Sequence, residues 1–326
     1  FFTIRQLPKA QQDMMLSQLG EQQVAELSEK SNAETMKKFN ERPGTVSNQY
    51  LHDLYRFFKL SVRRHEFRDI FKEKLDLHHI PALNNVLYNE YILFPIADFY
   101  LKKERWNEAI EVYEEMETIG ALKGRGAEYY QKLGYALQKN KKYAEAIDAY
   151  LKADTLKPDN IWNNRHLAIC YRLNRNYQAA LSYYKKVEEA TPEASTAVFY
   201  IGSCLAELGQ YEEALNYFFK LDFIESNCVK AWRGIGWCSF ISLKYEQAMK
   251  YYEKIIEHKP LAIDYMNAGH VAWVMGNIQK AAVLYGKAIT ACGTRERFLE
   301  MFHKDEEPLL KQGIREEDIP LMLDLL

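Results

Sequence analysis

An all-α solenoid, a stack of antiparallel helix pairs, is the fold that this sequence predicts. The first observation is a tyrosine that returns every 34 residues in four successive segments. The second is that small and aromatic residues keep the same interval around that tyrosine. The third is that apolar residues within each segment recur at i, i+3, i+4 and i+7, the spacing of one face of an α-helix. Self-similarity at a fixed period of this length indicates a repeat architecture.

Four aligned sets of residues carry the 34-residue interval. Small residues allow two helices to approach closely, aromatic residues fill the space beside them, and a proline ends the unit. Pro158, Pro192 and Pro260 occupy this last position, and Ser226 replaces the proline in one copy. The other aligned positions are Tyr143, Tyr177, Tyr211 and Tyr245, then Ala146, Ala180, Ala214 and Ala248, then Tyr150, Tyr184, Phe218 and Tyr252.

Each unit reads as two helices joined by a polar turn. In residues 127–160 the turn is the segment 138–142, which is rich in lysine, asparagine and glutamine. One apolar stripe precedes this turn and a second follows it, so we expect an antiparallel helix pair in every unit. The first stripe is Tyr130, Leu133, Gly134 and Leu137, and the second is Tyr143, Ala146, Tyr150 and Ala153.

This pattern resembles the tetratricopeptide repeat family, whose signature is W-x2-L-G-x2-Y, then A-x3-F, then P. The copy from Val229 has Trp232, Ile235 and Gly236, with Ser239 in place of the final tyrosine. The resemblance covers about residues 90–295. It implies a right-handed superhelix whose concave groove binds peptides, and a protein without enzymatic activity.

The chain divides by pattern into three regions. Residues 1–89 are an N-terminal helical region that includes one degenerate repeat, and residues 296–326 form short capping helices. We expect Leu321, Met322, Leu323, Leu325 and Leu326 to cover the apolar face of the last repeat. The repeats between these regions span residues 90–123, 127–160, 161–194, 195–228, 229–261 and 262–295.

Composition and motifs argue against several classes of protein. The formal net charge is −2 and no run approaches the ~18 apolar residues of a membrane span. The five cysteines form no C-x-x-C pair, and no cluster suggests a metal site, a cofactor or a catalytic group. We therefore expect a non-enzymatic, cytoplasmic protein, although the chain starts at Phe1 and a leader or an upstream domain stays an open alternative.

The expected binding surface is the side of each first helix that points away from the core stripe. This side should be polar, yet here it carries aromatic rings and arginines, which are enriched at interface hot spots. We expect it to bind a protein or peptide segment with apolar anchors and some acidic character. The residues are Tyr135, Trp162, Arg165, His166, Arg172, Phe199, Tyr200, Arg233, Trp237, Phe240, His270 and Trp273.

Other interpretations remain open at this stage. The chain's own N-terminal helices, or a second subunit of a homo-oligomer, could occupy the groove instead of a partner. The chain could also be the regulatory or sensing segment of a larger protein whose effector domain lies outside it. A basic cluster within residues 56–74 raises nucleic-acid binding, but interspersed carboxylates neutralise much of its charge and disfavour that reading.

Overall fold

The computed structural model describes residues 90–120 and 125–326. The chain separates into two compact units, Phe1–Leu75 and Asp76–Leu326, and the description that follows concerns the second unit alone. The predicted N-terminal helical region, its degenerate repeat and its basic cluster all lie outside the described residues.

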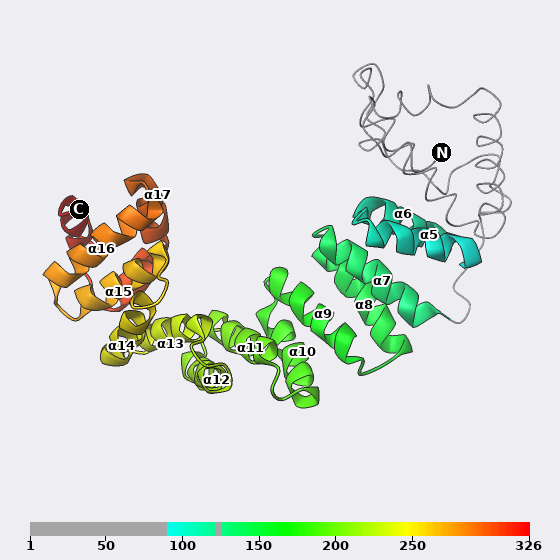
Figure 1. Cartoon of the computed structure of the whole chain (residues 1–326), viewed down its shortest axis with the longest axis horizontal. Helices are drawn as coiled ribbons and strands as arrows, with labels where there is room; N and C mark the ends of the chain where they lie inside the picture. The colour runs from blue at the N-terminus through cyan, green and yellow to red at the C-terminus, as the bar shows by residue number, and fades with distance from the viewer. Residues whose placement is uncertain (1–89, 121–124) are drawn as a thin grey trace, which may run out of the picture. The chain divides into compact units, whose positions relative to one another are not determined.

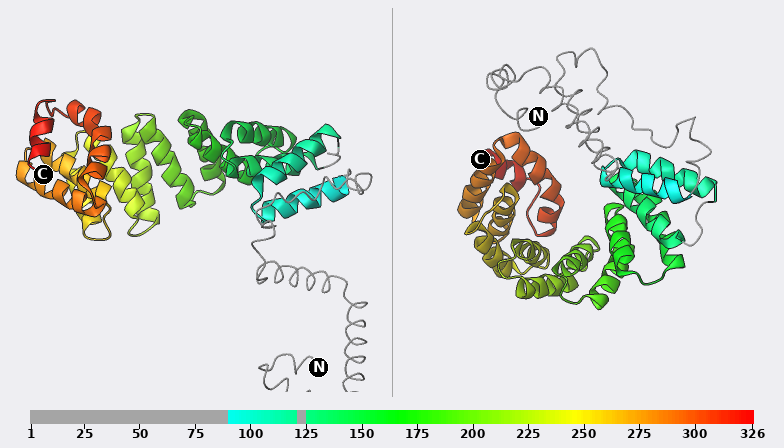
Figure 2. Two further views of the ribbon diagram at one scale, coloured as in Figure 1. Left: turned by 90° about the horizontal axis from the view of Figure 1, so that it is seen from above. Right: turned by 45° about the vertical axis from the view of Figure 1, so that its right-hand side comes forward.

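Helix pairs follow one another through the second unit in the order of the sequence (Figures 1 and 2). Within the described ranges every regular element is a helix. The predicted all-α solenoid of antiparallel helix pairs is therefore confirmed. The pairs are α5 (Glu90–Lys102) with α6 (Trp106–Thr118), α7 (Gly126–Lys139) with α8 (Tyr143–Leu156), α9 (Ile161–Leu173) with α10 (Tyr177–Ala190), α11 (Ser195–Glu207) with α12 (Tyr211–Ile224), α13 (Val229–Ile241) with α14 (Tyr245–Ile256), and α15 (Ala262–Val274) with α16 (Ile278–Cys292).

A close approach between the two helices of each pair explains the recurring small residue. Gly269 on α15 faces the buried ring of Tyr285 on α16, and a Cβ added at this glycine would lie 2.5 Å from that ring. Gly134 faces Tyr150 in the same way, at 2.8 Å. The repeating glycine and ring thus set the distance between the paired helices.

Several first helices also contact the first helix of the next pair. α7 contacts α9, α11 contacts α13, and α13 contacts α15. Between the second helices that the structure describes, no contact of similar extent occurs. The first helices therefore stand closer together than the second helices, and we call the side they present away from the second helices the inner face.

Short helices follow the last pair: α17 (Arg295–Phe302), the 3₁₀ helix η3 (His303–Asp305), α18 (Glu306–Lys311) and α19 (Asp318–Asp324). α17 lies against α15 and α16 (Figure 1). Its Phe298 and Phe302 are fully buried, with ring centroids 5.7 Å and 5.6 Å from that of Tyr285.

The residues expected to cover the last repeat do so in part. Met322 is buried and Leu323 and Leu326 pack against the core cluster, whereas Leu321 and Leu325 are each 64% exposed. Two phenylalanines of α17, one turn apart, also cover the last pair, because their rings pack against Tyr285. In the described ranges, no helix combines the length and the apolar character that crossing a bilayer requires.

The Gly269 contact yields a test with a matched control. Gly269→Ala should lower the free energy of unfolding by about 1–2 kcal/mol, because overpacking against Tyr285 outweighs the better helix propensity of alanine. Gly286 lies inside α16 with nothing within 4 Å of an added Cβ. Gly286→Ala should therefore raise the free energy of unfolding by up to about 1 kcal/mol.

Urea unfolding of the two variants and the parent measures both effects. Equal effects of the two substitutions would contradict the packing explanation, since both change glycine to alanine within a helix.

Candidate protein-interaction surface

All predicted groove residues lie on first helices. Tyr135 belongs to α7, and α9 carries four of the residues, Trp162, Arg165, His166 and Arg172. The others are Phe199 and Tyr200 on α11, Arg233, Trp237 and Phe240 on α13, and His270 and Trp273 on α15. Their surroundings differ sharply between the middle and the end of the array.

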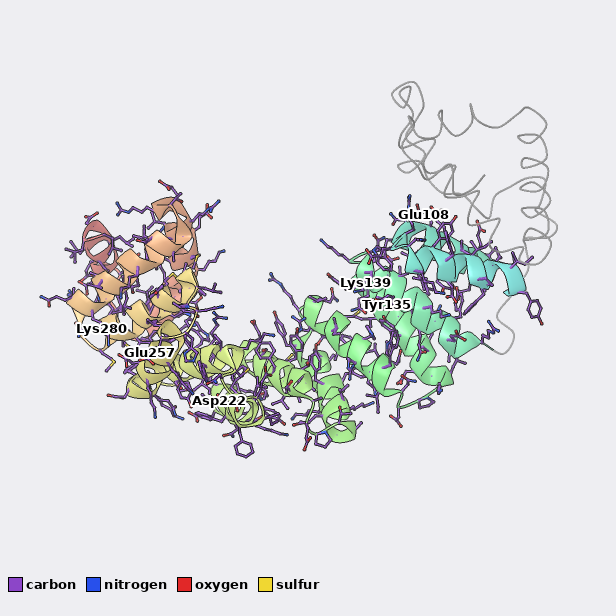
Figure 3. The ribbon with its side chains drawn as sticks, viewed as in Figure 1. Glu108, Tyr135, Lys139, Asp222, Glu257 and Lys280 are labelled. Carbon is purple, nitrogen blue, oxygen red and sulfur yellow. The ribbon has the colours of Figure 1, made fainter. Side chains whose placement is uncertain are left out.

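An aromatic cluster joins α7 to α9. The ring centroids of Trp162 and His166 lie 4.0 Å apart, and that of Tyr135 lies 5.6 Å from His166. Trp162 and His166 also pack against Tyr150, the buried ring of the preceding pair, at 6.0 Å and 5.7 Å. One side of this cluster therefore packs against the core through Tyr150. Trp162 nevertheless remains 41% exposed. Tyr135 and Lys139 lie one turn apart on α7 (Figure 3), and the Lys139 Nζ atom is 5.2 Å from the tyrosine ring centroid.

His166 is held as a neutral ring. Its Nδ1 atom lies 2.8 Å from Oε1 of Gln138. Burial, followed by the positive charges of Arg165 and Lys139, lowers the pKa of His166 to about 4. The imidazole thus packs among the aromatic rings without contributing a charge near neutral pH.

A second aromatic group joins α9 to α11. The guanidinium of Arg172 lies 4.4 Å from the ring centroid of Tyr200, and Tyr200 stacks on the buried Tyr184 at 5.3 Å. Phe199 is half-buried, with its centroid 6.2 Å from that of Phe218. The cation–π contact with Tyr200 restricts the orientation of the arginine.

Arg233 forms an ion pair within the chain that the sequence did not predict. Its Nε and Nη2 atoms donate to the two carboxylate oxygens of Asp264, both at 2.7 Å. The Asp264 side chain is 1% exposed and also accepts the backbone N–H of Leu261 at 2.7 Å. The bidentate ion pair couples α13 to α15, so Arg233 does not present a free charge to a partner.

Phe240, His270 and Trp273 are buried, which corrects the expectation that they line an open groove. Phe240 and Trp273 belong to one core cluster with residues of the C-terminal helices. His270 bonds through Nδ1 to the Tyr285 hydroxyl at 2.8 Å, and its Nε2 lies 3.5 Å from Oδ2 of Asp305 in η3. The C-terminal helices contributing to the cluster supply Phe298, Phe302, Leu309, Ile319 and Met322.

The C-terminal helices reach back as far as α13 and α14. The Tyr245 hydroxyl donates to Oε1 of Gln312 at 2.8 Å, and Nε2 of Gln312 donates to the carbonyl oxygen of Ile241 at 3.5 Å. Trp237 is half-buried, and its ring centroid lies 5.7 Å from that of Phe240. The inner face of the last two pairs is therefore largely occupied by the chain itself.

The part of the predicted surface that stays accessible is narrower than expected. We call it the middle inner face and define it by its residues: Tyr135, Lys139, Trp162, Arg165, Arg172, Phe199 and Tyr200. All are exposed or half-buried and belong to α7, α9 and α11.

The described residues show no grouping typical of a metal site. In residues 90–120 and 125–326 no group of three or more histidine, cysteine or acidic side chains is arranged to hold a metal ion. All five cysteines are free, and burial raises the pKa of the Cys170 thiol to about 12. A thiol with so high a pKa is a poor nucleophile at neutral pH.

Comparisons with known proteins agree with the predicted repeat fold. Family models described as tetratricopeptide repeat match residues 93–120, 127–160 and 171–221. A tetratricopeptide repeat protein from Parabacteroides merdae, with a solved structure, is 21% identical, with a TM-score of 0.52 over 72% of this chain and 98% of that protein. This structural likeness shows the fold.

Further solved structures resemble this chain more weakly. YrrB, described as a TPR protein with an unusual peptide-binding site, is 21% identical, with a TM-score of 0.48 over 56% of this chain and 96% of its own. MamA is 20% identical, with a TM-score of 0.48 over 52% of this chain and 92% of its own. No curated protein matches the chain significantly.

The Arg233–Asp264 ion pair predicts that two arginine substitutions change the free energy of unfolding by different amounts. Arg233→Ala should lower the free energy of unfolding by about 2–3 kcal/mol, because it leaves the buried carboxylate of Asp264 without its counterion. Arg165 is exposed, and the described part of the chain places no carboxylate within ion-pair distance of it. Arg165→Ala should therefore change the free energy of unfolding by less than about 0.5 kcal/mol.

Urea unfolding of both variants measures the difference. Similar losses in the two variants would show that the ion pair does not stabilise the packing of α13 against α15.

The lowered pKa of His166 predicts a dependence of stability on pH. The unfolded side chain titrates near 6.5 and the folded one near 4, so the unfolded state binds more protons between these values. The contribution of the neutral ring to stability is complete above pH 6.5 and is lost as the pH falls toward 4. Acidification from about pH 7 to about pH 5 should destabilise the parent more than His166→Gln, in which no group titrates at this position.

Urea unfolding at the two pH values measures this difference. An equal loss in parent and variant would mean that folded His166 titrates near its ordinary pKa.

Proposed function

We propose that this chain, which belongs to the tetratricopeptide repeat superfamily, binds a segment of a partner protein along the middle inner face. Tetratricopeptide repeats support a protein-interaction scaffold in general, because stacked repeats create extended concave surfaces that bind other proteins. We further propose that the scaffold has no enzymatic activity. We also propose that the protein is cytoplasmic, because all five cysteines are free thiols.

The observation that carries the proposal is the partial exposure of aromatic rings on three neighbouring first helices. Trp162 and Tyr200 each pack one side against a buried tyrosine, Tyr135 packs against Trp162, and all three rings stay partly accessible. Rings fixed in this way lose little conformational entropy when a partner covers them, and for that reason they make strong contacts in interfaces.

Occupation by the chain's own C-terminal helices limits the site. These helices contact α13 to α16, whereas the core contacts described for them include no residue of α7, α9 or α11. Among the residues that the structure describes, the C-terminal helices therefore leave the first helices of the middle repeats uncovered. The proposed site spans about three repeats.

The experiment compares an inner variant with an outer aromatic control. Trp162→Ala combined with Tyr200→Ala removes two rings of the middle inner face, and Phe223→Ala removes a ring that is 91% exposed at the end of α12. Each protein, immobilised as the full chain, is incubated with lysate of the source cell, and bound proteins are quantified by mass spectrometry. At least one specific partner should be captured about tenfold less by the inner variant, which corresponds to about 1.4 kcal/mol.

Phe223→Ala should capture that partner as the parent does. Far-UV circular dichroism and thermal melting verify that both variants keep their helices. Loss of the partner from the outer variant, or equal capture by all three proteins, would contradict the placement of the site.

A further inference from the structure

The positive charges of the middle inner face, and that of Lys230 next to its Phe199, are not neutralised within the described part of the chain. Lys139 on α7, Arg165 and Arg172 on α9, and Lys230 at the start of α13 lie along the first helices. None has a carboxylate within 4.0 Å among the residues that the structure describes. Arg165 and Lys230 are exposed, as is Lys139, and Arg172 is half-buried.

Several lysines elsewhere in the array are paired with carboxylates. Lys152 pairs with Glu117 at 3.3 Å, Lys220 with Glu188 at 2.6 Å, and Lys244 with Glu212 at 2.6 Å. In each case a lysine reaches a carboxylate on an earlier pair of helices. Even on α7, Lys132 contacts both Asp98 and Glu128 at 2.8 Å. The four cations named above lack this compensation.

Three of these cations lie over aromatic rings. Lys139 is 5.2 Å from the ring centroid of Tyr135, Arg172 is 4.4 Å from that of Tyr200, and Lys230 is 6.0 Å from that of Phe199. A ring beneath a cation restricts the position of the cation. The side of the cation that points away from the ring can then meet an incoming anion. Charge and apolar surface therefore alternate along the same face.

We infer that the partner segment is an acidic stretch of polypeptide whose carboxylates meet these cations and whose apolar side chains contact the rings between them. The inference rests on the proposed function. Neighbouring first helices pack at about 8–10 Å, so the path from α7 to α13 is about 30 Å long. An extended peptide rises about 3.3 Å per residue, and about nine to ten residues cover that distance.

A nucleic acid fits the surface less well. Binding to phosphates requires a basic stripe or patch, and the chain as a whole carries 45 acidic against 43 basic residues. Four cations spread over three first helices, α7, α9 and α13, match the spaced carboxylates of a peptide better than a continuous phosphate backbone.

The test uses a defined probe with the full chain. A fluorescein-labelled peptide of four Glu-Glu-Leu repeats is titrated with the protein, and fluorescence anisotropy reports binding. A peptide of four Lys-Lys-Leu repeats and an oligouridylate of twelve nucleotides are the comparison probes. The acidic peptide should bind more tightly than either, and its affinity should fall when salt is raised from about 50 mM to about 300 mM.

Two double variants separate the local charge from the overall charge. Lys139→Gln with Arg165→Gln removes two exposed cations of the middle inner face, and should weaken binding of the acidic peptide about tenfold. Lys185→Gln with Lys250→Gln removes two exposed cations from the second helices α10 and α14 and should change the affinity less than about twofold. All four substitutions are at exposed side chains, so the melting temperatures should stay close to that of the parent.

Three outcomes would overturn the inference: no binding of the acidic peptide, tighter binding of the basic peptide or the oligouridylate, or equal weakening by the two double variants. The first of these leaves the proposed function standing if the inner aromatic variant still loses its cellular partner. Retention of that partner by the aromatic variant would instead refute the proposed site itself.

Discussion

The contact between a small residue on each first helix and a ring on the second determines the geometry of the array. Gly134 faces Tyr150, Gly202 faces Phe218, and Gly236 faces Tyr252, each so closely that an added Cβ would lie within about 3 Å of the ring. Because the distance within a pair is fixed in this way, successive pairs stack in a regular manner. The first helices then share one continuous side.

The same rings link the core to the inner face. Tyr150 is covered by Trp162 and His166 of the next pair, and Tyr184 is covered by Tyr200. The aromatic residues that look available for binding are thus partly committed to holding neighbouring pairs together. This double role keeps the rings in place in the absence of a partner, which favours affinity through pre-organisation.

The last pair shows what happens when no further repeat follows. Tyr285 needs a cover, and Phe298 and Phe302 of α17 provide it. The chain then continues across the inner side of α15 to Tyr245, where Gln312 forms its hydrogen bond. Covering an apolar end and filling the inner face are consequences of the same packing requirement.

Much of the fold could be predicted from the sequence, because each repeat contacts chiefly its neighbours and leaves a signal at an interval of 34 residues. The helix pairs, the small residues opposite the rings and the inner position of Trp162 and Tyr200 all follow from that interval. The burial of His270 could not be predicted, since Asp305 and Phe302, which cover it, belong to no repeat. The pairing of Arg233 with Asp264 was also missed, because Asp264 sits at the start of α15 where its helix-capping role hides its contact with a distant arginine.

A partner protein should meet the first helices of the middle repeats. Site-specific photo-cross-linking in the source cell tests this contact, with benzoylphenylalanine placed at Arg165 on the middle inner face or at Phe223 at the end of α12. Covalent adducts with a partner protein are expected from position 165 and none from position 223. Adducts from position 223 alone would contradict this expectation.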